Sequence, residues 1–448
     1  MAVPPRATDS FPADLDVVIP GSGPIGAVFA RTLVDKGRKG DLRLLSVPTS
    51  KEYMSRDLSS WSPKSAFCRT GQNPSQDDSV NLPASAATRV IGGMGSHWTC
   101  CTPRQHELER SELFDNDQAS AVQSMPLACT PKHADYIEWS CSTTILGNLS
   151  APNSTHPKFR IWPNMQCMKL ELAKGEVTKM TVKDILHDPS GTFEIKAKKY
   201  GHFMTEQTLS FCQVILKHGF AEEFNHLRKT GESERFTAEE AKEFKDRMDA
   251  TWDRLDPLPF PLNDPDSQVC IRFSEDKPWH MQIHRDAFGY DEVPHGIDQR
   301  VVVDLRSFGY TTPKKENRVT FKPDTNDGFG MPQPTFEFEM TKGDRDRCDD
   351  MFVDMVAIAR LLGGFLPGAE PKYLPMGSAL HVCGTYRAGT GVDKSVVDKT
   401  GKVHGMGNLV LGGCGVIPTG NACNPTLTAA AFALAAADEL DSVLPRPK

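Results

Sequence analysis

Short apolar runs and helix-length segments alternate at the start of the chain. Residues 16–19 have the pattern of a short buried strand, residues 24–33 that of the helix after it, and residues 43–45 that of a second strand. A strand, a helix and a strand in this order predict a βαβ unit with a parallel sheet. Residues 51–87 are rich in Ser, Pro and Asn, which predicts a long surface excursion before a strand at residues 88–91.

The rest of the chain has the patterns of strands in its middle and of helices toward its end. Alternating apolar and polar residues predict antiparallel strands over residues 168–198. Further strands are predicted at residues 301–304, 335–339 and 409–411. Helix-type patterns predict helices at residues 234–254, 345–362 and 426–444, with Gly363 and Gly364 ending the second helix.

Composition excludes some classes of partner. A length of 448 residues predicts two or three domains, and 51 basic against 58 acidic side chains leave a formal charge of −7. No net positive charge therefore attracts nucleic acid or an anionic membrane, and a small neutral substrate is favoured. Twelve cysteines include no Cys-x-x-Cys pair, so neither a zinc site nor any other metal site is predicted, and the thiols are expected to be reduced.

The N-terminal residues have no targeting pattern. Residues 1–13 lack the apolar centre of a signal peptide, and no apolar run approaches the roughly 18 residues of a membrane span. We expect a soluble protein, intracellular or exported without a signal peptide, with residues 1–11 disordered.

A glycine motif follows the first predicted strand. It consists of Gly21, Ser22, Gly23, Pro24, Ile25 and Gly26. In a dinucleotide-binding fingerprint the first glycine makes the turn, the second admits the pyrophosphate and the third lets helix and strand pack closely. The motif predicts an FAD or NAD site at the helix N-terminus.

Two features depart from that fingerprint. Pro20 takes the last strand position, where it removes a ladder donor. A ribose-binding acid is expected about 20 positions after the last glycine, but the count from Gly26 reaches Ser46. Asp41 precedes the second strand and Glu52 lies beyond a proline.

A second glycine-rich stretch, residues 92–100, contains Gly93, His97, Trp98 and Thr99. Glycines let the backbone approach a planar ligand, and the imidazole offers a nucleophilic nitrogen, so His97 is a candidate for cofactor attachment. A structural hydrogen-bonding role for this histidine stays open.

An ordered string of residues near the C-terminus resembles the glucose-methanol-choline (GMC) flavoprotein oxidoreductases. It runs through residues 381–387, Gly389, residues 397–398, Gly405, residues 408–409, Pro418 and residues 424–426. The resemblance implies that His381 and Asn424 meet at the reactive edge of a flavin. It also implies that Gly413, Pro425 and Thr426 bind the cofactor.

The resemblance extends to the sugar-oxidising branch of that family, for which residues 205–213 are among the further matching stretches. It implies that His97 bonds covalently to the flavin 8α-methyl carbon and that Thr99 lies near N5 and O4. It further implies a sugar site made of Gln282, Asp286, Phe288, Tyr290 and Arg306. An amide, a carboxylate and a guanidinium suit several hydroxyls, although polar residues on a surface turn would give the same pattern.

The implied fold is α/β, with two domains. A discontinuous Rossmann-like FAD-binding domain comprises residues 12–110, 151–199 and 376–445, and a substrate domain on an antiparallel sheet comprises residues 111–150 and 200–375. The family is typically homotetrameric. The implied reaction oxidises D-glucose and similar pyranoses at C2, with O2 reduced to H2O2 or a quinone as acceptor, and with neutral His381 as base and Asn424 orienting the hydroxyl.

Alternatives remain open at this stage. Two explanations fit the missing ribose acid, a contraction at residues 116–132 and a shortened adenine-wall region near residues 193–206. The protein is a flavin-poor or impaired homologue, or the sequence comes from a gene model that dropped coding segments. A related sugar oxidase or dehydrogenase with another regiochemistry or acceptor is a further alternative. An NAD-linked dehydrogenase is disfavoured because it would leave the His381 and Asn424 signature unexplained.

Overall fold

The protein was analysed as a computed structural model. It describes residues 17–37, 42–45, 67–69, 82, 86–88, 93, 101–103, 105, 122–124, 128–133, 136–150, 156, 159–162, 165–184, 204–217, 219, 226–227, 230–233, 237–239, 241–242, 245–246, 268–285, 302–326 and 332–443.

The N-terminal βαβ unit has the predicted form. Strands β1 (Val17–Pro20), β2 (Leu42–Leu45) and β8 (Phe159–Trp162) form a parallel sheet in the order β1-β2-β8. Helix α1 (Pro24–Asp35) connects the first two, and it begins where extended Gly23 precedes a proline at the first helical position. Pro20 is the last residue of β1, so its missing N–H interrupts no hydrogen bond between strands beyond that point.

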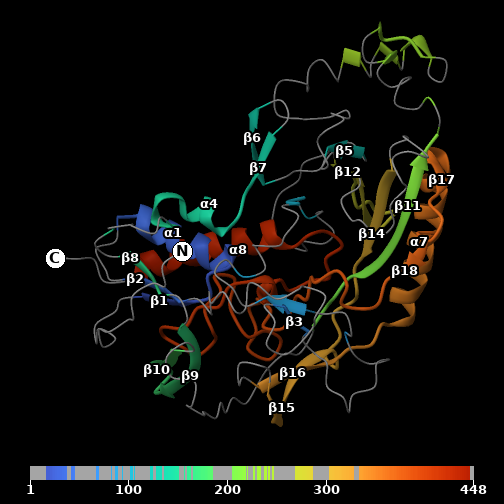
Figure 1. Cartoon of the computed structure of the whole chain (residues 1–448). Coiled ribbons are helices and arrows are strands. Elements are labelled where there is room, and N and C mark those ends of the chain that lie inside the picture. The colour runs from blue at the N-terminus through green and yellow to red at the C-terminus, as the bar shows by residue number, and fades with distance from the viewer. Residues whose placement is uncertain are drawn as a thin grey trace.

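Helices from distant parts of the chain pack on this unit. Helix α8 (Thr426–Val443), the short α4 (Ser142–Leu146) and the 3-10 turn η3 (Gly147–Ser150) contact α1 or one another. Leu33, Phe159 and Ala433 share one buried core, which therefore joins both ends of the chain (Figure 1).

Leu146 and Leu149 also belong to this core. The sequence assigned residues 111–150 to the substrate domain, but residues 142–150 pack with the core around α1 instead. The other domain boundaries stay a prediction.

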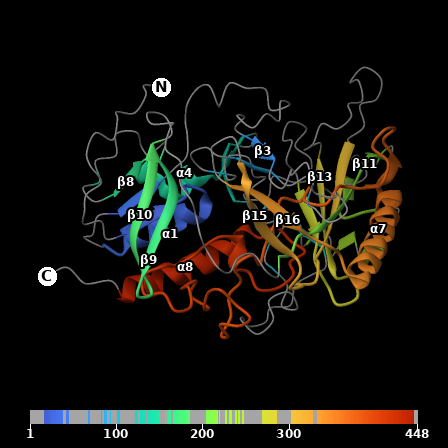
Figure 2. The same cartoon turned by 90° about the horizontal axis from the view of Figure 1, so that it is seen from below.

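A larger antiparallel sheet forms the second body, with strand order β17-β11-β14-β13-β12-β5 and β18 beside β11. Its strands are β5 (Val122–Ser124), β11 (Thr208–Leu216), β12 (Gln268–Ile271), β13 (Trp279–Arg285), β14 (Val302–Gly309), β17 (Gly363–Phe365) and β18 (Lys372–Tyr373). Helix α7 (Lys342–Leu362) lies along the sheet (Figures 1 and 2). Met355 and Ala359 of this helix form a core with Leu305 and Met281 of the sheet, as an amphipathic helix on an antiparallel sheet requires.

Four antiparallel hairpins complete the described strands. They pair β3 (Phe67–Arg69) with β4 (Ala86–Thr88), β6 (Cys129–His133) with β7 (Tyr136–Trp139), β9 (Met165–Ala173) with β10 (Glu176–Asp184), and β15 (Arg318–Asn326) with β16 (Pro332–Glu337). The antiparallel strands predicted over residues 168–198 are confirmed as far as residue 184, and residues 185–198 lie outside the described residues.

Some sequence expectations differ from the structure. The strand predicted at 409–411 is wrong, because Val410 makes only an isolated bridge to Lys402 in an irregular segment that ends in the turn η4 (Cys414–Val416). The strand predicted at 88–91 corresponds to β4, which ends at Thr88, and residues 89–91 lie outside the described residues, as do residues 1–11. Among the described residues, no helix has the length and apolarity needed to cross a bilayer.

Candidate active site

The fingerprint turn needs glycine at its first and last glycine positions, for different reasons. Gly21 has φ +120°, in the region that favours glycine. A Cβ at Gly26 would lie 1.9 Å from the carbonyl oxygen of Gly21, so only glycine fits there. No side chain caps α1, and the N–H groups of its first turn are available to a pyrophosphate. These residues fit an FAD or NAD phosphate.

The second glycine-rich stretch approaches the same turn. Gly93 has φ +54°, and a Cβ there would lie 3.3 Å from the Cα atom of Gly23. The structure therefore places Gly93 against the fingerprint turn, as one shared cofactor site requires. His97, Trp98 and Thr99 lie outside the described residues, so the attachment of a cofactor to His97 stays a prediction.

The C-terminal segment packs on the fingerprint helix. Ile25 contacts a cluster that contains Cys383, Cys414 and Ala429. A Cβ on Gly412 would lie 2.6 Å from the ring of Phe29, which shows how closely the irregular segment approaches α1. Gly413 follows with φ +111°, and Pro425 and Thr426 stand at the start of α8. All three of these candidate cofactor residues are thus on elements that adjoin the fingerprint.

His381 and Asn424 contact each other directly. Asn424 Nδ2 lies 3.5 Å from His381 Nε2, and the second ring nitrogen, Nδ1, lies 2.7 Å from Gln207 Oε1. Burial, together with the charges of Arg306 and the neighbouring His280, lowers the pKa of His381 to about 3. The imidazole is therefore neutral at physiological pH, which is the form that accepts a proton.

The two described residues of the predicted sugar site lie on neighbouring strands. Gln282 on β13 is paired with Arg306 on β14. Gln282 is fully buried and donates through Nε2 to Asn424 Oδ1, so it holds the catalytic candidate as well as facing the site. The Arg306 guanidinium lies 5.3 Å from the ring centroid of Phe308, and that ring packs 5.9 Å from His381. Asp286, Phe288 and Tyr290 lie outside the described residues.

Glu206 and Gln207 are the site residues to which sequence reasoning assigned no role. The Glu206 carboxyl is buried and accepts from the main-chain N–H groups of Gln207 at 2.8 Å and His381 at 3.2 Å. Burial raises the pKa of Glu206 to about 8, against the lowering effect of these two bonds. The segment 205–207 belonged to the stretches that resemble the GMC family, and that was the one signal that could have pointed to it.

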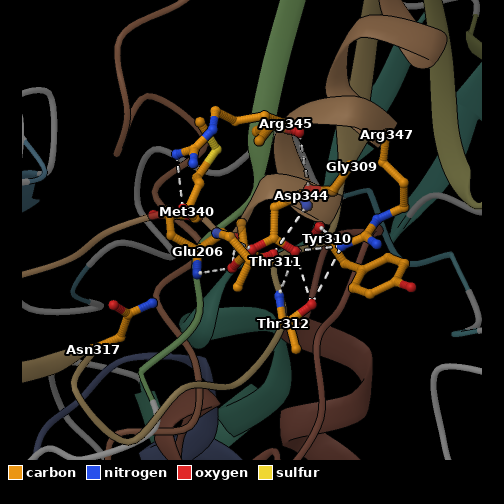
Figure 3. A network of polar contacts seen from close by, with 12 residues as sticks. Glu206, Gly309, Tyr310, Thr311, Thr312, Asn317, Met340, Asp344, Arg345 and Arg347 are labelled. Carbon is orange, nitrogen blue, oxygen red and sulfur yellow. Dashed lines mark hydrogen bonds and ion pairs between the residues drawn. The ribbon is translucent and has the colours of Figure 1, made fainter.

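A polar network holds this segment against the second body (Figure 3). The Thr311 hydroxyl bonds both the main-chain N–H and the main-chain carbonyl of Glu206. The adjacent Thr312 donates from its N–H and its hydroxyl to Asp344 Oδ1, at 3.0 and 2.8 Å. Asp344 is also the third residue of the capping box that Thr341 begins, so the N-terminus of α7 fixes the position of the loop beside Glu206.

Comparison with known proteins shows the family of this chain, and solved structures of low sequence identity share its fold. The family model described as GMC oxidoreductase matches residues 313–433. Pyranose 2-oxidase of Emericella nidulans is 34% identical, with 95% of this chain and 92% of the relative covered. C-glycoside 3-oxidase of Microbacterium trichothecenolyticum is 24% identical over 96% of both proteins.

Among solved structures, pyridoxine 4-oxidase from Mesorbium loti has a TM-score of 0.61 at 13% identity and covers 96% of this chain and 99% of its own. The alignment with the Emericella protein spans 568 positions, more than the 448 residues of this chain, so the relative has segments that this chain lacks. The chain belongs to the GMC oxidoreductases, the family of FAD-dependent enzymes that oxidise CH–OH groups, and within that family to the relatives of pyranose 2-oxidase.

Proposed function

We propose that this protein is an FAD-dependent oxidase of pyranose sugars that oxidises D-glucose and similar aldopyranoses at C2 and passes the electrons to O2 or a quinone. One observation carries the proposal: a neutral, half-buried histidine contacts Asn424, and a strand pair bearing Gln282 and Arg306 lies beside it. The similarity to pyranose 2-oxidase over most of both chains supports the choice of a sugar.

The fingerprint turn would hold the cofactor by its pyrophosphate. Gly21, Gly23 and Gly26 leave the main chain open to it, and Gly93, Gly413, Pro425 and Thr426 contribute from adjoining segments. FAD, when bound, supplies the two-electron oxidising power that the CH–OH group requires.

His381 and Asn424 would act on the same hydroxyl oxygen. Nε2 of His381 takes the hydroxyl proton, and the low pKa of this imidazole keeps Nε2 unprotonated over the whole neutral range. Asn424 Nδ2 points toward that nitrogen and donates to the oxygen on which negative charge develops.

Two groups would set the orientation of the sugar ring. Arg306 offers several N–H donors from a half-buried position above Phe308. Gln282 acts indirectly, because its amide nitrogen fixes the side chain of Asn424. Asp286, Phe288 and Tyr290 complete this proposed site as further hydroxyl partners and apolar walls.

His97 would form a covalent bond to the flavin. The proposal is motivated by the glycine-rich context of His97 and by the absence of a ribose-binding acid at Ser46. Acid precipitation of the wild type should leave the flavin in the pellet, whereas the flavin of His97→Ala should pass into the supernatant. Complete release from the wild type would contradict the bond.

The regiochemistry can be tested with labelled glucose. Anaerobic glucose should bleach the flavin absorbance, and deuterium at C2 should slow that bleaching while deuterium at C3 leaves it unchanged. The similarity to C-glycoside 3-oxidase makes C3 the second candidate. A primary isotope effect with the C3 label alone would show that the enzyme oxidises C3 and not C2. A colourless purified protein would instead indicate a flavin-poor homologue.

A further inference from the structure

The Gln207 side chain has a fixed orientation because main-chain atoms determine it. Its Nε2 donates to the carbonyl oxygens of Asn421 at 2.7 Å and Cys423 at 2.8 Å. A carbonyl oxygen only accepts, so the amide nitrogen must face these atoms. Oε1 is therefore the atom that lies 2.7 Å from His381 Nδ1.

This orientation decides which ring nitrogen of His381 carries the proton. Oε1 has no hydrogen, so the contact is a hydrogen bond only when Nδ1 is protonated. In the neutral imidazole Nε2 then carries the lone pair. Nε2 is the nitrogen that faces Asn424.

The opposite side of His381 agrees with this assignment. Asn424 must present its Nδ2 to the unprotonated Nε2, which leaves Oδ1 to accept from Gln282 Nε2. Gln282 Oε1 in turn lies 3.0 Å from His284 Nε2 and accepts from it. In this chain of hydrogen bonds, from His284 through Gln282, Asn424, His381 and Gln207 to the main chain at residues 421 and 423, each side chain donates to the next. None of these bonds requires the other tautomer of His381.

We propose that Gln207 is a positioning residue that holds His381 in its Nδ1–H tautomer and so keeps Nε2 ready to take the substrate proton. The proposal rests on the proposed function for the role of Nε2. Gln207 is 2% exposed, and among the described residues its side chain bonds His381 and the main chain of residues 421 and 423, which it ties together. Glu206 supports the same arrangement from behind, since its carboxyl holds the main-chain N–H groups of both His381 and Gln207.

The test compares Gln207→Met with Gln207→Glu, and uses Gln213→Met as a matched control. Methionine keeps the volume but accepts no strong hydrogen bond, whereas a carboxyl oxygen still accepts from Nδ1. Gln213 is equally buried but bonds Asp304 on β14 instead of the site. The first readout is the tautomer of His381, from ¹⁵N imidazole shifts of histidine-labelled protein, assigned by the signal that His381→Gln removes.

Gln207→Met should show the Nε2–H tautomer, with the limiting rate of flavin reduction by glucose lowered about tenfold to a hundredfold and the sugar dissociation constant nearly unchanged. Gln207→Glu should recover the Nδ1–H signal and most of the rate, and Gln213→Met should leave both unchanged. An unchanged tautomer in Gln207→Met overturns the proposal, whatever its rate. If Gln207→Met does not fold, an Nε2–H signal in the wild type or in Gln207→Glu overturns it.

The tautomer measurement does not depend on the substrate. A wild type that glucose fails to reduce would therefore refute the proposed function, while the ¹⁵N shifts would still test the role of Gln207.

Discussion

The two halves of the candidate site differ in what they present: the fingerprint half presents main-chain atoms, and the half around His381 presents polar side chains. Around the fingerprint the main chain is exposed by glycines: Gly21 and Gly93 have positive φ angles, and Gly26 has no room for a Cβ. Around His381 the structure offers buried polar side chains that bond one another in a defined direction. Under the proposed function, the fingerprint half would admit the cofactor closely, and the histidine half would fix a proton on one ring nitrogen of His381.

The contrast predicts different sensitivities to substitution. In the fingerprint half, a single side chain introduced at a glycine position should abolish cofactor binding. In the histidine half the loss of a hydrogen bond should lower a rate in steps, while the cofactor stays bound.

The largest effect is expected for Gly26→Val. Its Cβ would collide with the Gly21 carbonyl oxygen, so the turn has to open and the purified variant should carry no flavin. The ratio of flavin to protein absorbance measures this. Gly391→Ala is the matched control, because a Cβ there meets nothing within 4 Å and should leave flavin content unchanged. Wild-type flavin content in Gly26→Val would mean that the fingerprint does not bind the cofactor.

A smaller effect is expected for Asn424→Ala. Removing the Nδ2 donor should slow flavin reduction by glucose about 10²- to 10³-fold, with flavin content retained. Stopped-flow absorbance under anaerobic conditions measures the rate. Asn408→Ala serves as the control, since Asn408 bonds the main chain of Val177 on β10 instead. Equal rates in the two variants would exclude Asn424 from the chemistry.

Acidification should have the smallest effect on the rate. The pKa of His381 is lowered to about 3, and in the described part of the chain the ionisable groups near this histidine are Glu206, Arg306 and His280. The limiting reduction rate should therefore vary by less than about twofold between pH 7 and pH 5, whereas an ordinary histidine with a pKa of about 6.5 would lose about 30-fold. An apparent pKa near 6.5 in the limiting rate would show that His381 is not the base or is not buried in the enzyme.

The same histidines should make stability depend on pH. The pKa values of His280, His284 and His381 are each lowered to about 3 by burial. Below a pH of about 6.5, the ordinary pKa of histidine, these side chains bind protons in the unfolded chain but stay neutral in the folded protein. The free energy of unfolding should therefore fall as the pH drops from about 6.5 toward 3. Urea titrations at pH 7 and pH 5 measure the change. Equal or greater stability at pH 5 would contradict the burial of neutral histidines.

Sequence reasoning succeeded where local rules decide the structure. Gly23 followed by Pro24 marks the start of α1, and the capping box from Thr341 to Asp344 marks the start of α7 a few residues before the predicted 345. The predicted end of α7 at Gly363 agrees with its cap. These signals lie within a few residues of the ends that they determine.

It failed where distant segments decide. Leu409 to Leu411 are apolar enough for a strand, but the segment bonds a loop and makes a single bridge. Gln207 is an ordinary polar residue in sequence, and its bond partner in His381 stands 174 positions further along. No periodicity or spacing reports such a contact, whereas the family resemblance pointed to His381 and Asn424 because the ordered string itself carries that information.

The most direct measurement is the anaerobic reduction of the bound flavin by glucose in the wild type and in His381→Ala. The account predicts rapid bleaching of the wild type and bleaching slowed about 10²- to 10⁴-fold in a variant that still carries flavin. Equal bleaching rates in the two proteins would contradict His381 as the base.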